Sequence, residues 1–245
     1  MGSVPEAAVS PSSTLGFLPR LIGVIRYPRT TFRAAAAAPR WAGLVVVLTL
    51  AMAVSQAVML ATEVGQVALV DQWERTALGF GQDVDDARYA QFQALSQSGP
   101  LYGVASALVY GPVLTVAVAT LVFLVFRRRA DRPVSFSQVL SVIAHAGVIL
   151  TIRQVVAAPV SFMRETTASA TSLGVWFPTL DVASAVGRFV GALDVFVLWW
   201  VIVLAIGVAV LYGWRARTLV LSFLGVYAGV ALLLAATMAA LGGTA

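Results

Sequence analysis

Four polar side chains within long apolar stretches are the residues that could do chemistry in this sequence: Gln138, His145, Arg153 and Asp194. Placing an ionisable group in a bilayer costs a few kcal/mol, so each such group calls for a partner or a function. A histidine could pass a proton, and the other three could contact a solute or an ion. We therefore treat these residues as a candidate intramembrane polar cluster.

The histidine lies between small residues, in the sequence Ile143-Ala-His-Ala-Gly147. A neutral imidazole there could donate one hydrogen bond to a neighbouring helix. We favour this structural interpretation over proton transfer, because few acidic residues lie nearby in the sequence.

Arg153 and Asp194 lie toward the outer ends of two consecutive apolar stretches that run in opposite directions. Their depths are therefore comparable, and we expect them to form an ion pair. In the alternative, Arg153 snorkels to the outer headgroups and Asp194 meets water. The pair is favoured, because an aspartate side chain is too short to snorkel far.

Catalytic and metal-binding motifs are absent from the sequence. It has no cysteine and one histidine, which excludes thiol nucleophiles, disulfides and cysteine metal sites. It also lacks His-Glu-x-x-His, Gly-x-Ser-x-Gly and a glycine-rich phosphate loop. We expect no enzyme activity, no metal and no cofactor.

Asp83-Val-Asp-Asp86 resembles the opening of an EF-hand loop. Arg88 stands where that loop needs glycine, and Ala94 stands where it needs a bidentate glutamate. We interpret this segment as a helix start, with Asp83 as the N-cap and the two later aspartates in the first turn.

Composition identifies the class of protein. Of 245 residues, 60% are hydrophobic and 11% are charged, against about 25% charged in a soluble domain. A hydrocarbon core of about 30 Å needs about 20 apolar residues in a helix. Five stretches meet that length, at residues 41–62, 101–126, 134–159, 188–211 and 218–241.

The predicted fold is an all-α, polytopic membrane protein, a bundle of five transmembrane helices with an N-terminal interfacial helix. Residues 15–27 are too short to span but strongly apolar, which favours a helix lying in the interface, with a partner-binding helix as the alternative. The membrane domain is expected over residues 15–241, after a disordered tail at 1–14 and before a short tail at 242–245.

Arginine counts predict the sidedness of the membrane protein. Eleven arginines lie before the first span or in the links 127–133 and 212–217, whereas the opposite side has three arginines and eight acidic residues. The positive-inside rule then places the N-terminus in the cytoplasm and the C-terminus outside, in a cytoplasmic (inner) membrane. The basic excess reflects this topology and does not indicate nucleic-acid binding.

Small residues and one proline bear on how the helices pack. Gly187 with Gly191, and Gly225 with Gly229, have the spacing that lets helix backbones approach closely, within the bundle or between two copies. Pro112 predicts a kink in the second span, as a hinge or as a simple bend.

Three segments at the mouths of the spans resemble the bacterial branch of the Yip family of Ypt/Rab-interacting membrane proteins. They are Pro28-Arg-Thr-Thr-Phe32 with Pro39-Arg-Trp41, Ser135-Phe-Ser-Gln-Val-Leu-Ser-Val-Ile-Ala144, and Leu193-Asp-Val-Phe-Val-Leu-Trp199. The resemblance covers about residues 15–241 and implies five spans with a cytosolic N-terminus. Gln138 and Asp194 match polar positions of the family's third-span and fourth-span motifs.

The same resemblance limits the choice of partners. Eukaryotic relatives are linked to Rab GTPases and vesicle traffic, whereas the bacterial ones have no established activity. Only about 14 residues precede the interfacial helix in this chain, so we do not carry over a Rab-type GTPase. The expected partners are the lipid bilayer and either other membrane proteins or a second copy of the chain.

Two classes of function remain. One is a non-enzymatic integral membrane scaffold or organiser that binds partner proteins or lipids. The other is a small-solute or ion transporter or channel that uses polar residues of the third and fourth spans. We favour the scaffold, because five spans show no evident repeat and the polar groups, His145 excepted, lie toward the span ends. A continuous polar cavity reaching His145 would favour transport instead.

We expect reporter fusions at the C-terminus to confirm the topology. Alkaline phosphatase fused there should be active and a cytoplasm-active fluorescent protein should be dark, because five spans place that end outside. An inactive phosphatase together with a bright fluorophore would contradict the arginine count.

Overall fold

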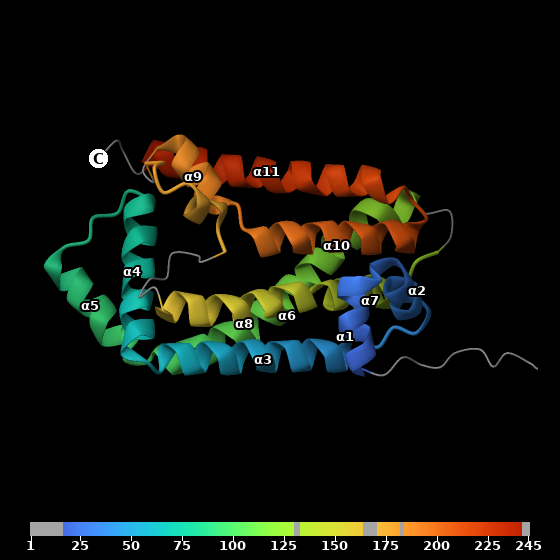
Figure 1. Ribbon diagram of the computed structural model, residues 1–245, viewed down its shortest axis with the longest axis horizontal. Helices are drawn as coiled ribbons and strands as arrows, with labels where there is room; N and C mark the ends of the chain where they lie inside the picture. The colour runs from blue at the N-terminus through green and yellow to red at the C-terminus, as the bar shows by residue number, and fades with distance from the viewer. Residues whose placement is uncertain (1–16, 130–132, 164–170, 182–183, 242–245) are drawn as a thin grey trace, which may run out of the picture.

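The structure is a computed structural model that describes residues 17–129, 133–163, 171–181 and 184–241. The tails predicted at 1–14 and 242–245 lie outside these described residues. Within them, five helical segments are long and apolar enough to cross a membrane. They run side by side along the long axis of the molecule (Figure 1). The chain is thus an all-α, multi-pass membrane protein, as predicted.

Three of the five spans are single helices close to their predicted bounds: α3 (Ala42–Leu60), α6 (Gly99–Phe126) and α11 (Ala216–Leu241). Pro112 lies inside the continuous helix α6. The third span consists of α7 (Phe136–Ala146) and α8 (Val148–Met163), which join at Gly147.

The predicted start of the fourth span at residue 188 is wrong. That span is α10 (Val195–Tyr212), and the residues before it form a separate short helix, α9 (Ala185–Ala192). Leu193 and Asp194 between them have extended backbone, with φ of −85° and −119°. Asp194 forms an antiparallel bridge with Ser172, which holds the chain extended at this point.

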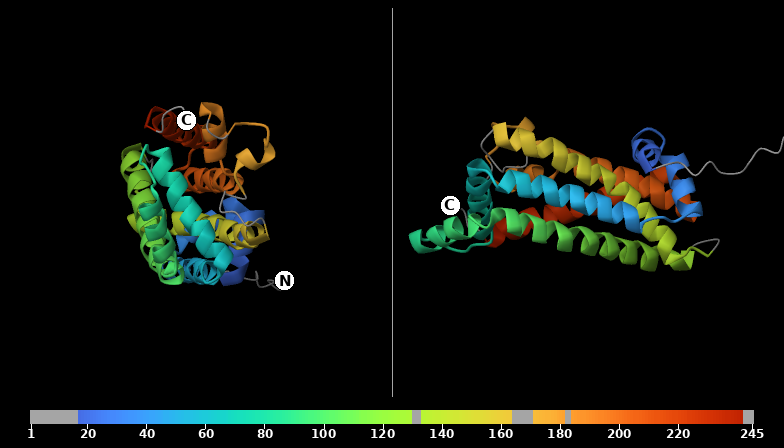
Figure 2. Two further views of the ribbon diagram at one scale, coloured as in Figure 1. Left: turned by 90° about the vertical axis from the view of Figure 1, so that its left-hand side faces the viewer. Right: turned by 90° about the horizontal axis from the view of Figure 1, so that it is seen from below.

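The two ends of the bundle carry short helices (Figure 2). One end, which we call the arginine-rich end, holds α1 (Phe17–Arg26), α2 (Pro28–Ala37) and η1 (Arg127–Arg129). The single interfacial helix of the prediction is thus followed by a second helix, because Pro28 ends one and suits the first turn of the next.

The opposite end holds α4 (Glu63–Gly79), α5 (Asp86–Ser96), η2 (Leu173–Trp176) and α9. The N-cap of α5 is Asp85, whose Oδ1 accepts from the backbone N–H of Arg88 at 2.8 Å. The prediction of Asp83 as the cap is therefore wrong by two residues.

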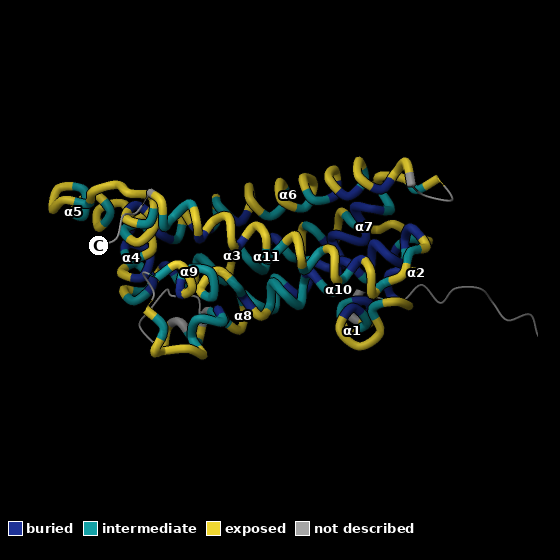
Figure 3. The backbone as a smooth tube through the Cα atoms, turned by 90° about the horizontal axis from the view of Figure 1, so that it is seen from above, coloured by how far each residue is buried: buried dark blue, intermediate teal, exposed yellow. Residues whose placement is uncertain are grey.

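Burial is concentrated where α2, α7 and α10 meet, whereas half of the residues of α6 are exposed (Figure 3). Phe32 of α2 is fully buried against α7 and α10. Gly207 of α10 permits this contact, because a Cβ there would lie 2.6 Å from Val142 Cγ1 and 3.2 Å from the Phe32 ring. Gly225 and Gly229 face open space, so their spacing is not used for packing within the described chain.

We expect Gly207→Ala to lower the melting temperature of the purified protein. The added methyl group would force Val142 and Phe32 apart, and such overpacking costs about 1–3 kcal/mol. Gly225→Ala is the matched control in a membrane-spanning helix, and it should leave the melting temperature unchanged or raise it. Equal effects of the two substitutions would contradict the close packing at Gly207.

Candidate functional site

Gln138 joins two helix ends at the arginine-rich end of the bundle. Its Oε1 accepts from the backbone N–H of Ser135 at 2.9 Å, and the Ser135 hydroxyl accepts from the Gln138 N–H at 3.3 Å. This reciprocal capping box starts α7. The Gln138 amide also donates to the carbonyl oxygen of Ala36 in α2 at 3.1 Å. Both ends of the Gln138 amide are therefore occupied by backbone groups.

Ser141 and His145 continue this pattern one and two turns further along α7. The buried Ser141 hydroxyl donates to the carbonyl of Ala35 at 3.1 Å. Ala35 and Ala36 belong to the last turn of α2, whose carbonyls have no partner within their own helix. His145, 1% exposed, places Nδ1 2.7 Å from the Ser141 carbonyl oxygen. A carbonyl oxygen only accepts hydrogen bonds, so Nδ1 carries the proton. We expected this bond to reach a neighbouring helix, but it lies within α7.

Asp194 is the centre of a second polar site, at the opposite end. Arg153 Nε in α8 lies 2.8 Å from Asp194 Oδ2, which is the ion pair predicted from the sequence. The other carboxylate oxygen, Oδ1, accepts from the backbone N–H groups of Phe196 and Val197 at 2.9 and 3.1 Å. Asp194 therefore pairs with a cation and caps the start of α10 at the same time.

Two further residues complete the Asp194 site. The hydroxyl of Thr171 donates to Oδ2, and the backbone N–H of Asp194 donates to the hydroxyl of Tyr227 in α11 at 3.0 Å. Burial alone would raise the pKa of the Asp194 carboxyl, but the hydrogen bonds from Thr171 and Arg153 and the charge of Arg153 hold that pKa below its ordinary value of 3.8. The carboxylate is thus ionised at neutral pH.

The candidate cluster therefore divides between the two ends of the bundle. Arg153 and Asp194 bond to each other, whereas Gln138 and His145 bond to backbone carbonyls of α2 and α7. Sequence reasoning missed Ser135, Ser141, Thr171 and Tyr227. The spacing Ser-x-x-Gln at 135–138 is a capping-box signal that identifies the first of these. The others have no local signal, because the fold alone brings them to their partners.

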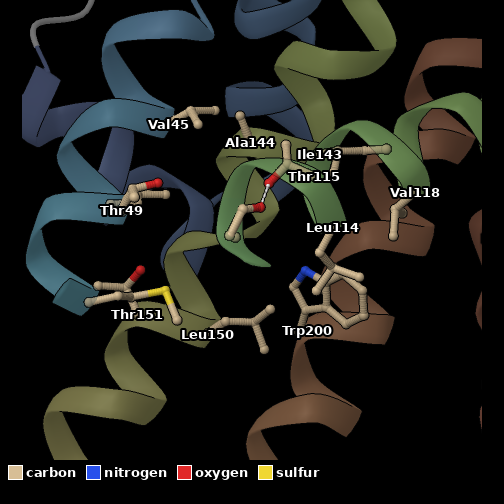
Figure 4. A pocket seen from close by; sticks show the side chains of 14 residues that line it. Val45, Thr49, Leu114, Thr115, Val118, Ile143, Ala144, Leu150, Thr151 and Trp200 are labelled. Carbon is tan, nitrogen blue, oxygen red and sulfur yellow. Dashed lines mark hydrogen bonds between the residues drawn. The ribbon is translucent and has the colours of Figure 1, made fainter. Parts of the chain in front are cut away.

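A cavity lies between α3, α6, α7, α8 and α10 of the membrane-spanning bundle (Figure 4). Its volume is about 80 Å³, and its lining is mostly apolar, with threonines and one tryptophan. Two side-chain donors there, Thr151 Oγ1 and Trp200 Nε1, are buried without a hydrogen-bond partner. His145 and Arg153 do not line this cavity.

The geometry offers no metal centre within the described residues, where no group of three or more His, Cys, Asp or Glu side chains could hold an ion. What the two polar sites can do is satisfy helix ends and fix helices to one another. The first site links α2 to α7, and the second links α8, α10 and α11.

Comparisons with known proteins gave one match. A family model described as Yip1 domain matches residues 22–238. No curated protein and no solved structure matches the chain.

We expect Arg153→Ala and Asp194→Asn to be coupled in their effect on stability. Each single change removes the opposite charge from this ion pair, so the double variant should lose less than the two single losses added, by about 0.5–3 kcal/mol. Asparagine is chosen because its side-chain oxygen can still cap α10. Thermal melts in detergent measure the effect.

The matched control is Arg217→Ala, which removes an exposed arginine at the other end of the bundle. Its effect should add to that of Asp194→Asn. If Arg153→Ala is equally additive, the pair does not hold α8 to α10.

Proposed function

The chain belongs to the Yip1 domain family, and on that premise we propose that it is a non-enzymatic scaffold of the membrane. It binds a partner protein through the α1–α2 hairpin at its arginine-rich end. The observation that carries this proposal is that one side of the hairpin is fixed to the bundle while its other side exposes apolar side chains.

The lower side of the hairpin is fixed to the bundle. Phe32 is fully buried, and the carbonyls of Ala35 and Ala36 accept hydrogen bonds from Ser141 and Gln138 of α7. The outward side exposes Ile22, Ile25 and Tyr27, which are 54%, 42% and 69% exposed. Exposed apolar side chains on a preformed surface favour recognition of a partner, because little conformational freedom is lost on binding.

The same hairpin supports the orientation. Arg26, Arg29 and Arg33 are exposed on it, and exposed arginines follow α6 and α10 at the same end. By the positive-inside rule this end lies on the cytoplasmic side of a bacterial inner membrane. The C-terminus then lies on the outer side. The motifs quoted from the sequence favour the bacterial branch of the family.

The interior of the bundle supports a scaffold over a transporter. Every residue from Val139 to Ala146 in α7 is buried. The polar side chains of this run, Ser141 and His145, bond to backbone carbonyls. The cavity of about 80 Å³ has an apolar lining that does not include His145.

Site-specific photo-crosslinking in native membranes tests the proposal. A photoreactive residue at Ile25 should capture a defined protein, and one at Phe80, 42% exposed at the opposite end, should not capture it. Tyr27→Glu should abolish the capture, because a charge replaces an apolar contact. Capture that is equal at both positions, or unaffected by Tyr27→Glu, contradicts the proposal.

A flux assay in proteoliposomes tests the transporter alternative directly. The purified protein should not increase ion or solute flux. Flux that appears with the protein and is lost in His145→Ala would overturn the scaffold proposal.

A further inference from the structure

Arg20 is a buried arginine on a helix at the surface of the bundle. The residue is 8% exposed, and its Nε is buried without a hydrogen-bond partner. Val24, one turn further along α1, is fully buried, so Arg20 lies on the face of α1 that packs against the protein. Its charge acts on His145 of α7. The guanidinium is thus held against the bundle rather than extended into solvent.

This burial requires compensation. Removing a guanidinium from water costs several kcal/mol unless an anion and hydrogen bonds replace the water. From residue 17 to residue 40 the sequence contains five arginines and no acidic residue. His145 cannot supply a negative charge, because its imidazole is either neutral or positively charged. Among the described residues no carboxylate forms an ion pair with Arg20, so the compensating anion comes from outside this part of the chain.

The position of α1 identifies the source of that anion. Leu21, the next residue, packs with Trp41 against Leu44, Ala144 and Val148, at the start of the spanning helix α3. Tryptophan at the start of a membrane span lies at the level of the lipid headgroups. Arg20, the residue before Leu21, therefore lies near the end at which α3 enters the membrane.

The surface around Arg20 favours an anionic lipid. Arg26, Arg29 and Arg33 are exposed on the same hairpin. Clustered arginines attract anionic headgroups, each contributing about 1 kcal/mol near the membrane surface. A guanidinium also matches a phosphate geometrically, because it can donate two parallel hydrogen bonds to it.

We propose that Arg20 binds the phosphate of an anionic phospholipid in the leaflet at the arginine-rich end. The lipid seals the hairpin against α7 and neutralises the buried charge. The exposed arginines raise the local concentration of such lipids, and Arg20 makes the specific contact. The inference does not depend on the partner protein proposed above, because it concerns the buried side of the hairpin.

Thermal melts of the full chain in lipid-free detergent test the proposal. Phosphatidylglycerol added to the wild type should raise the melting temperature, and phosphatidylcholine or inorganic phosphate should raise it much less. Arg20→Met should reduce the apparent affinity for phosphatidylglycerol about tenfold or more, since a charge-assisted hydrogen bond is lost. Arg26→Met, an exposed arginine on the same helix, should retain at least half of the wild-type response.

The melting temperature without lipid gives a second readout, in which Arg20→Met should not be destabilising. Arg20→Met should melt at or above the wild-type temperature without lipid, because an uncompensated buried charge has been replaced by an apolar side chain. A residue with a merely structural role would lower the melting temperature in both conditions. The partner capture at Ile25 is measured separately, so failure of one proposal leaves the other testable.

Three results would overturn the lipid assignment. One is an equal response of the wild type and Arg20→Met to phosphatidylglycerol, and another is an equal effect of inorganic phosphate. If Arg20→Met does not fold, native mass spectrometry of the wild type and of Arg26→Met can test whether the protein retains an anionic lipid. Both should retain phosphatidylglycerol in preference to phosphatidylcholine, and the absence of such retention contradicts the proposal.

Discussion

Backbone groups at a helix end need partners, and a helix end packed against other helices can take them from side chains. Two such ends shape this molecule. The last carbonyls of α2 accept hydrogen bonds from Gln138 and Ser141, and the first N–H groups of α10 donate to Asp194. Polar residues that suggest chemistry in the sequence, Gln138 and Asp194 among them, thus form hydrogen bonds with backbone groups at helix ends. Their placement fixes α2 on α7 and α10 beside α8.

The sequence predicts those features that depend on hydropathy or on charge at a given depth. Five apolar stretches and the Arg153–Asp194 pair are of this kind. The break between α9 and α10 could not be predicted in this way. Asp194 stands alone in an apolar run, and a hydropathy average cannot distinguish a helix cap from a residue within a span. The contacts of Thr171 and Tyr227 with Asp194 depend on the fold of segments 23 and 33 residues away along the chain.

Prominent contacts at the two ends of the bundle differ in how they depend on pH. At the arginine-rich end, aromatic side chains pack closely, with Phe126 5.4 Å from the rings of both Tyr212 and Trp214. At the opposite end, directional hydrogen bonds around Asp194 join α8, α9, α10 and α11. Apolar packing is insensitive to pH, whereas the Asp194 site needs an ionised carboxylate. Acidification therefore weakens the Asp194 site and leaves the aromatic packing around Phe126 unchanged.

The unequal lengths of the lipid-facing helices have a consequence for the bilayer. The 19 residues of α3 span ~29 Å and the 28 residues of α6 span ~42 Å, at 1.5 Å per residue. Gly99 and Gly103 of α6 lie against Leu60 at the end of α3, so the extra length of α6 projects at the arginine-rich end. Lipid beside α3 meets a shorter hydrophobic belt than lipid beside α6. Bilayers accommodate such a mismatch at a modest cost, by thinning beside the shorter helix or by tilting of the longer one.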